Sequence, residues 1–161
     1  MQRLQTSLFL RALGLGAVAG MRSMTAPALL SYFLSHRKGS ARLNSALSEP
    51  LANPAVANAL GLLAVGELIV DKLPITPNRT LPPSVAFRAL SGAVVGSALY
   101  ESRNQSRATG AMVGALAAVA ATYGAFALRR ALSRKGVLPD PVLGAVEDAI
   151  ALRSGVSALR P

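Results

Sequence analysis

Residues 108–128 read ATGAMVGALAAVAATYGAFAL, a stretch of 21 residues without a charged side chain. Arg107 precedes the stretch, and the pair Arg129-Arg130 follows it. A helix needs about 20 apolar residues to cross the hydrocarbon core of a bilayer, which is about 30 Å thick. The stretch therefore predicts a transmembrane helix with basic residues at both of its ends.

Three further apolar segments are long enough, or nearly so, to cross a bilayer. They cover 7–34, 54–73 and 85–100. The second segment has clear start signals, because Asn53 is a good N-cap and Pro54 fits the first helical position. The third is short and contains Arg88, whose side chain we expect to extend outward to the lipid head groups.

The segment 7–34 contains a sequence that interrupts a helix, Gly20-Met21-Arg22-Ser23-Met24-Thr25-Ala26-Pro27. Gly20 is a natural helix end, and Pro27 is tolerated at the start of a helix but not inside one. We therefore expect two half-helices joined by an irregular link. Non-helical backbone at membrane depth is found only where protein or water surrounds it.

The last apolar stretch, 141–153, follows the helix-start signal Asp140-Pro141 and is too short to cross a bilayer. We expect a short re-entrant or interfacial helix there. The expected fold is an all-α membrane protein with one domain over residues 1–161. It is a compact bundle of about four transmembrane helices, the first broken near Gly20-Pro27, with this short helix at its C-terminal end.

The composition points to a membrane protein and excludes several kinds of chemistry. The chain is 52% hydrophobic and 15% charged, whereas soluble domains have about 25% charged residues. Without cysteine it has no thiolate nucleophile and no Cys-ligated metal site. The single histidine, His36, lies in a polar run and is expected to be a solvated loop residue. We expect no cofactor.

The net charge of +10 would suggest nucleic acid as a partner in a soluble protein. The basic residues, however, gather in the gaps between apolar segments, as in loops that flank membrane helices. We therefore expect the lipid bilayer as the partner, and no nucleic acid. Lys and Arg are more frequent on the side of a four-span model that holds the termini. This excess places both termini in the cytoplasm, in a multi-pass protein of the cell (inner) membrane.

Glycines four residues apart occur in three of the apolar segments. The pairs are Gly16 and Gly20, Gly92 and Gly96, and Gly110 and Gly114. Small residues at this spacing let two helix backbones approach closely, which is how membrane helices associate. The pairs predict a compact bundle and leave homo-oligomerisation open.

Glu67 and Asp71 are four residues apart, so they share one face at the end of the second segment, next to Lys72. Two like charges on one face repel each other unless a cation, a proton or an arginine lies between them. If this pair is inside the membrane, it is the candidate for a proton or metal site. The alternative is that both carboxylates lie at the head-group boundary, solvated and paired with Lys72.

The break in the first segment is a candidate anion site, made of Arg22, Ser23 and Thr25. The second half-helix would point free backbone N–H groups and its positive dipole end into the bundle beside the Arg22 guanidinium. The alternative is a hinge in which Arg22 pairs with Glu67, Asp71 or Glu147. The polar loop at 76–83 could hold a phosphate or carboxylate through Thr76 and Arg79, or be a plain connector.

Four motifs carry a resemblance to a known family. They are Gly20-Met21-Arg22-Ser23-Met24-Thr25-Ala26-Pro27, Gly66-Glu67-Leu68-Ile69-Val70-Asp71-Lys72-Leu73-Pro74, Thr76-Pro77-Asn78-Arg79, and Pro139-Asp140-Pro141 followed by Glu147-Asp148. Over nearly its whole length the chain resembles a bacterial family of small integral membrane proteins known as domain of unknown function 4126. The resemblance implies a membrane location and no assigned biochemistry. It directs attention to the charged residues of the motifs, which are Arg22, Glu67, Asp71, Lys72, Arg79, Glu147 and Asp148.

These features favour a small transporter or channel-like protein for an ion or a small polar solute over an enzyme. Carriers of this kind bind their cargo between half-helices. Arg22 would meet an anionic group, while Glu67 and Asp71 would carry a proton or a cation. The candidate binding residues are Arg22, Ser23, Thr25, Glu67, Asp71, Lys72, Thr76, Arg79, Arg88, Asp140, Glu147 and Asp148.

Two other functions stay open. One is a membrane-embedded enzyme or binder of lipid phosphates, in which carboxylates hold Mg²⁺ and Arg79 or Arg88 grips the phosphate. Its carboxylates would be Glu67, Asp71, Glu147 and Asp148. The other is a non-catalytic scaffold whose polar residues all form structural ion pairs.

Overall fold

The computed structural model describes residues 2–36, 47–70, 80–134 and 140–159, and every regular element in these ranges is an α-helix. In chain order the helices are α1 (Gln2–Met21), α2 (Thr25–His36), α3 (Ser48–Leu51), α4 (Pro54–Val70), α5 (Pro82–Glu101), α6 (Arg107–Arg134) and α7 (Asp140–Leu159). The all-helical class expected from the sequence is confirmed for the described part of the chain.

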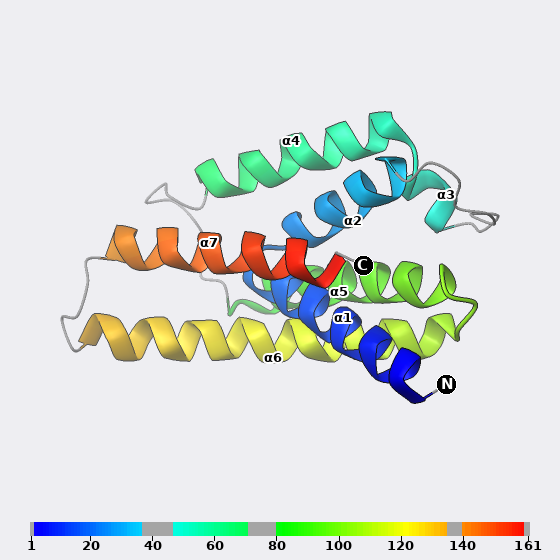
Figure 1. The fold of residues 1–161 in the computed structure, drawn as a ribbon. Coiled ribbons are helices and arrows are strands. Elements are labelled where there is room, and N and C mark those ends of the chain that lie inside the picture. Colours follow the sequence, from blue (N-terminus) through cyan, green and yellow to red (C-terminus); the bar gives the residue numbers. More distant parts are fainter. Residues whose placement is uncertain (1, 37–46, 71–79, 135–139, 160–161) are drawn as a thin grey trace.

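Helix α1 lies at the centre of the molecule. It packs against α5, α6 and α7, while α2 and α4 form a pair on the side away from α6 (Figure 1). The centre of the core is apolar and fully buried, and many of its members come from α1, α5 and α6, with Ala26 of α2 and Ala151 of α7 beside them. They include Leu15, Val18 and Ala19 of α1, Val95 of α5 and Ala118 of α6. Helix α4 is peripheral, because it packs mainly on α2 and Ala57 is its single buried residue.

The glycine pairs lie where helix backbones touch. On α5 and α6, Gly96 faces Gly110, and a Cβ added at Gly96 would lie 2.9 Å from the Gly110 carbonyl carbon. On α1, a Cβ added at Gly16 would lie 2.8 Å from the Cβ of Ala117 on α6. Because real Cβ atoms do not come this close, these helices can pack as they do only with glycine at these positions. The prediction of a glycine-packed bundle is confirmed.

The predicted break in the first apolar segment is confirmed in position, but the two helices are not halves of one span. The chain reverses at the break, so that α2 runs back in the opposite direction to α1 (Figure 1). Helix α1 ends at Met21 and α2 begins at Thr25, so residues 22–24 form the link. Pro27 is the third residue of α2, where its missing N–H removes a donor that has no partner within the helix in any case.

The expectation of a short helix over 141–153 is wrong in length. Helix α7 runs from Asp140 to Leu159 and has 20 residues, which corresponds to about 30 Å. Gly155 does not end the helix, because it packs against Leu29 and Val18, where a larger residue would collide with the Leu29 side chain. The part of α7 beyond the expected end thus packs against α1 and α2. The four-residue helix α3, Ser48–Leu51, was not predicted.

Among the described residues, one helix is long and apolar enough to cross a membrane. This helix is α6, and only 17% of its most apolar stretch is buried. Most of this stretch is therefore exposed at the surface of the chain. Two shorter helical stretches, Thr6–Met21 and Pro54–Val70, are apolar as well.

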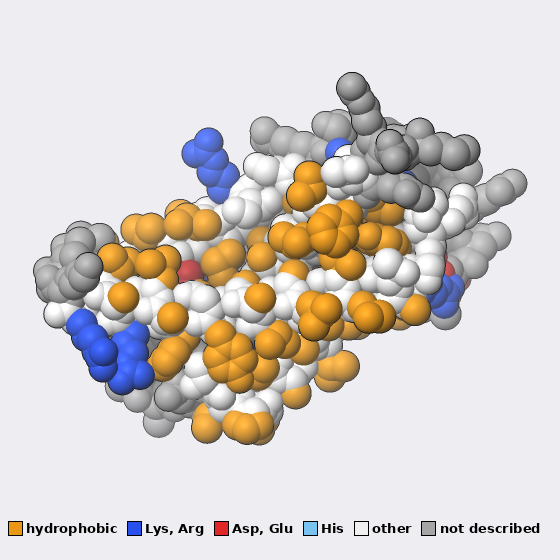
Figure 2. All heavy atoms as spheres, turned by 90° about the horizontal axis from the view of Figure 1, so that it is seen from below, with side chains coloured by type: hydrophobic (Ala, Val, Ile, Leu, Met, Phe, Trp, Pro, Cys, Tyr) orange, Lys and Arg blue, Asp and Glu red, His pale blue; other side chains and the backbone are white. Residues whose placement is uncertain are grey.

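Many large apolar side chains lie on the surface of the described part of the chain. Large apolar side chains are exposed on several helices, for example Leu62 on α4 (75%), Leu90 on α5 (64%) and Leu116 on α6 (66%). Figure 2 shows hydrophobic side chains across the middle of one face, with most of the Lys and Arg side chains in view toward its ends.

Candidate functional site

The link between α1 and α2 is buried, and it leaves two helix ends inside the molecule. Arg22 is 2% exposed and Ser23 is 8% exposed. The last carbonyl groups of a helix and its first N–H groups have no partners within the helix. A buried break of this kind is stable only where other groups supply the missing hydrogen bonds.

Glu67, which projects from α4, closes the N-terminal end of α2. Its Oε1 atom accepts hydrogen bonds from the backbone N of Ser23 (2.9 Å) and from the Ser23 Oγ (2.7 Å). Its Oε2 atom accepts one from the backbone N of Met24 (2.8 Å). A carboxylate at this place also faces the positive end of the α2 dipole. The position in which the sequence predicted a bound anion is thus occupied by a carboxylate of the chain itself.

Arg88, which projects from α5, closes the C-terminal end of α1. Its Nη1 atom donates to the carbonyl oxygens of Gly20 (2.6 Å) and Met21 (2.7 Å). The expectation that Arg88 extends to the lipid head groups is wrong, because the residue is 6% exposed and points into the bundle. The carbonyl groups at the negative end of α1 give its guanidinium an interior partner.

Arg22 forms an ion pair with Asp148 of α7. The Arg22 Nε donates to Asp148 Oδ1 at 2.7 Å, and the Nη2 contacts the same oxygen. The two side chains are 3% and 13% exposed. Asp148 was not among the partners that the sequence suggested for Arg22. The neighbouring Glu147 instead faces Arg129 of α6, with 4.0 Å between Nη1 and Oε2.

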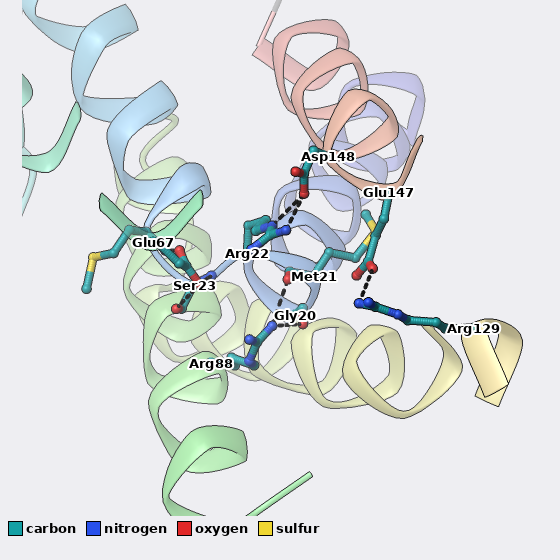
Figure 3. Close-up of polar contacts among 10 residues, drawn as sticks. Gly20, Met21, Arg22, Ser23, Glu67, Arg88, Arg129, Glu147 and Asp148 are labelled. Carbon is teal, nitrogen blue, oxygen red and sulfur yellow. Dashed lines mark hydrogen bonds and ion pairs between the residues drawn. The ribbon is translucent and has the colours of Figure 1, made fainter. Parts of the chain in front are cut away.

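Three charged side chains from three different helices therefore hold one break. Figure 3 shows Glu67, Arg88 and Asp148 reaching it from separate directions. Hydrogen bonds with a charged partner contribute about 1.5–3 kcal/mol each, so the link is held far more firmly than an ordinary loop. The arrangement pairs charged side chains with the two helix ends and with each other.

Two hydroxyl groups that the sequence did not single out complete the site. Thr122 of α6 donates from Oγ1 to the Gly20 carbonyl oxygen at 3.0 Å, and Ser91 of α5 donates to the Ser23 carbonyl oxygen. Hydroxyl residues inside otherwise apolar segments often bond across membrane helices. This signal was present in the sequence for both of them.

The structure places the remaining candidates as follows. Thr25 is the first residue of α2 and is buried. Asp140 begins α7, but its side chain lies outside the described residues. Four candidates lie outside the described residues altogether, and they are Asp71, Lys72, Thr76 and Arg79. In the described part of the chain, no three His, Cys, Asp or Glu side chains are grouped closely enough to hold a metal ion.

Two cavities flank the break. The larger, of about 650 Å³, lies between α2 and α4, is lined mainly by apolar residues and reaches Thr25. The smaller, of about 370 Å³, lies between α6 and α7 and reaches Met21, Arg129 and Glu147. The larger cavity lies beside α4, the helix that carries Glu67 and packs mainly on α2.

Comparison with known protein families gives one match. The family described as Domain of unknown function (DUF4126) matches residues 9–160. In comparisons with the curated proteins and with the solved structures, nothing matches the chain.

Proposed function

The chain belongs to the family of domain of unknown function 4126, and from this premise we propose a small multi-pass transporter or channel-like protein of the cell (inner) membrane. Its cargo is an ion or a small polar solute, its partner is the lipid bilayer, and both of its termini lie in the cytoplasm. The observation that carries the proposal is the buried break between α1 and α2, whose two ends are held by Glu67 and Arg88 of other helices.

The distribution of polar and apolar side chains supports the membrane location. Leu62, Leu90 and Leu116 are exposed on three different helices, while Arg22 and Arg88 are buried. A soluble protein rarely exposes apolar surface on so many elements, and in lipid the ionic groups must face the interior. The uncharged stretch 108–128 of α6 would extend about 32 Å, close to the thickness of the hydrocarbon core.

The broken helix supports transport. In many carriers a discontinuous helix presents its free ends to the cargo near the middle of the membrane. In this chain the end of α2 is bound by Glu67, which belongs to the lightly packed helix α4. Movement of α4 away from α2 would release two backbone N–H groups and the positive end of a helix dipole toward an anionic group of the cargo. The described conformation is then the closed one, with Glu67 in the place of the cargo.

Flux through proteoliposomes tests the proposal, with a panel of small anions and cations as the probes. The variant Glu67→Gln should change flux at least several-fold, because it alters the group that holds the closed state. Glu49→Gln is the matched control, since Glu49 is an exposed carboxylate on α3. If no probe crosses the membrane of vesicles that contain the wild-type protein, the proposal of transport fails. If the two variants transport equally, Glu67 has no part in transport.

A second candidate, a membrane scaffold, is favoured by one observation. At the break, Arg22, Glu67 and Arg88 each have partners within the chain. A scaffold would lose stability in Glu67→Gln without any flux in the wild-type protein. An enzyme or binder of lipid phosphates built on grouped carboxylates ranks below both, because Glu67 and Asp148 are engaged by different partners at the break.

A further inference from the structure

The groove between α6 and α7 begins beside the break, at Met21, and most of its lining comes from two helices that scarcely touch. Helix α7 packs on α1 and α2 and makes little contact with α6. The resulting groove of about 370 Å³ falls within the usual range of ligand sites, about 300–1,000 Å³. Most of its lining is apolar and comes from one stripe on each helix. The stripes include Ala121, Gly124 and Ala125 on α6 and Val146 and Ile150 on α7.

One end of this otherwise mainly apolar groove carries a basic side chain, that of Arg129. Arg129 lines it and is 31% exposed, so its guanidinium reaches the surface. Arg130 and Arg134 follow on the same helix, and both are exposed. Basic residues at the end of an apolar helix lie at the level of the lipid head groups, where they attract anionic lipids.

We propose that the groove between α6 and α7 binds an anionic phospholipid, with its phosphate on Arg129 and one acyl chain between the helices. The proposal rests on the membrane location given above, but not on transport. A guanidinium has five N–H donors, so Arg129 can hold a phosphate while it faces Glu147. An acyl chain fits the small residues of the α6 stripe, and a Cβ added at Gly124 would meet nothing within 4 Å.

Charge also argues against a second copy of the chain as the occupant. In a two-fold dimer with its axis along the membrane normal, equal residues lie at equal depth. Such a dimer through this face would bring Arg129, Arg130 and Arg134 toward their own copies, which is unfavourable. A phosphate group, by contrast, complements Arg129, the arginine that lines the groove.

Native mass spectrometry of the full chain in detergent tests the proposal, with phosphatidylglycerol and phosphatidylcholine as the probes. The wild-type protein should retain phosphatidylglycerol in preference. In Arg129→Gln this preference should fall about fivefold, which corresponds to about 1 kcal/mol for one arginine near the head groups. Gly124→Leu should reduce retention of both lipids at this groove, because it fills space that is open.

Three matched controls separate the site from general effects. Arg130→Gln removes the same charge next to the groove and should keep the preference. Glu147→Gln breaks the same ion pair as Arg129→Gln but leaves the cation, so it should keep the preference as well. Gly61→Leu adds the same side chain in open space on α4, at the larger cavity between α2 and α4, whose lining has no charged residue. This variant should leave the preference for phosphatidylglycerol unchanged.

Several results would overturn the proposal. They are equal retention of both lipids by the wild type, equal losses in Arg129→Gln and Arg130→Gln, and a dimer that Gly124→Leu converts to a monomer. Circular dichroism checks that each variant is folded. If Arg129→Gln does not fold, Gly124→Leu decides the question, because it touches no charged group. Lipid retention and solute flux are measured separately, so lipid binding can fail while transport holds, and the reverse.

Discussion

Replacing Glu67 by glutamine should destabilise the protein, because Glu67 closes the N-terminal end of α2. The side chain accepts three hydrogen bonds, two at Oε1 from Ser23 and one at Oε2 from the backbone N of Met24. A glutamine keeps one acceptor oxygen, which can serve the two donors of Ser23. Its NH₂ group then faces the Met24 N–H, so two donors oppose each other. The negative charge at the end of the α2 dipole is lost as well.

The magnitude follows from these two losses. A buried donor without a partner costs about 1–3 kcal/mol. Loss of a charge at a partly buried helix end costs up to about 2 kcal/mol. The free energy of unfolding should therefore fall by about 2–4 kcal/mol in Glu67→Gln. For a chain of this length, the expected decrease in Tm is about 5–15 °C.

Thermal unfolding in detergent micelles, followed by far-ultraviolet circular dichroism, measures this loss. The control is Glu49→Gln on α3, whose exposed side chain should change the free energy of unfolding by less than about 0.5 kcal/mol. If Glu67→Gln unfolds at the same temperature as this control, the carboxylate does not hold the break.

Two further predictions use the same assay. Arg22→Gln and Asp148→Asn should each lower the free energy of unfolding by about 3–5 kcal/mol, because each leaves a buried partner unpaired. The double variant should lose less than the sum of the two single losses. Additive losses would show that the two side chains do not interact. Gly114→Ala should lower stability by about 1–3 kcal/mol, because the new Cβ would lie 2.8 Å from the Gly92 carbonyl carbon. Gly124→Ala has open space around it and should raise stability by up to about 1 kcal/mol; equal effects of the two alanines would contradict the close packing of α5 on α6.

The sequence alone predicts those structural features that depend on residues close together in the chain. The break at residues 22–24 follows from Pro27, whereas Gly20 lies within α1 and packs on Ala118 of α6. The close contacts of α5 and α6 follow from the spacing of their glycines. Both are local patterns with a direct steric meaning.

The partners of the interior charges could not be predicted in the same way. Arg22 and Asp148 are 126 positions apart, and adjacent residues of a helix point in directions about 100° apart. The rotation of α7 therefore decides whether Asp148 or Glu147 faces Arg22, and this rotation depends on the packing of α7 against α1 and α2. Arg88 illustrates the same point, because its interior partners are backbone groups that exist only once α1 has ended.

Accessibility of introduced cysteines to a membrane-impermeant maleimide tests the membrane location most directly. The chain has no cysteine of its own, so single variants report on one position each. In intact membrane vesicles, Leu116→Cys in the middle of α6 should not react, although this side chain is 66% exposed in the isolated protein. Ser106→Cys, just before α6, and Arg130→Cys, in its last two turns, should react from opposite faces of the membrane. Labelling of Leu116→Cys at the rate of these two variants, with the protein in the soluble fraction, would contradict the membrane location.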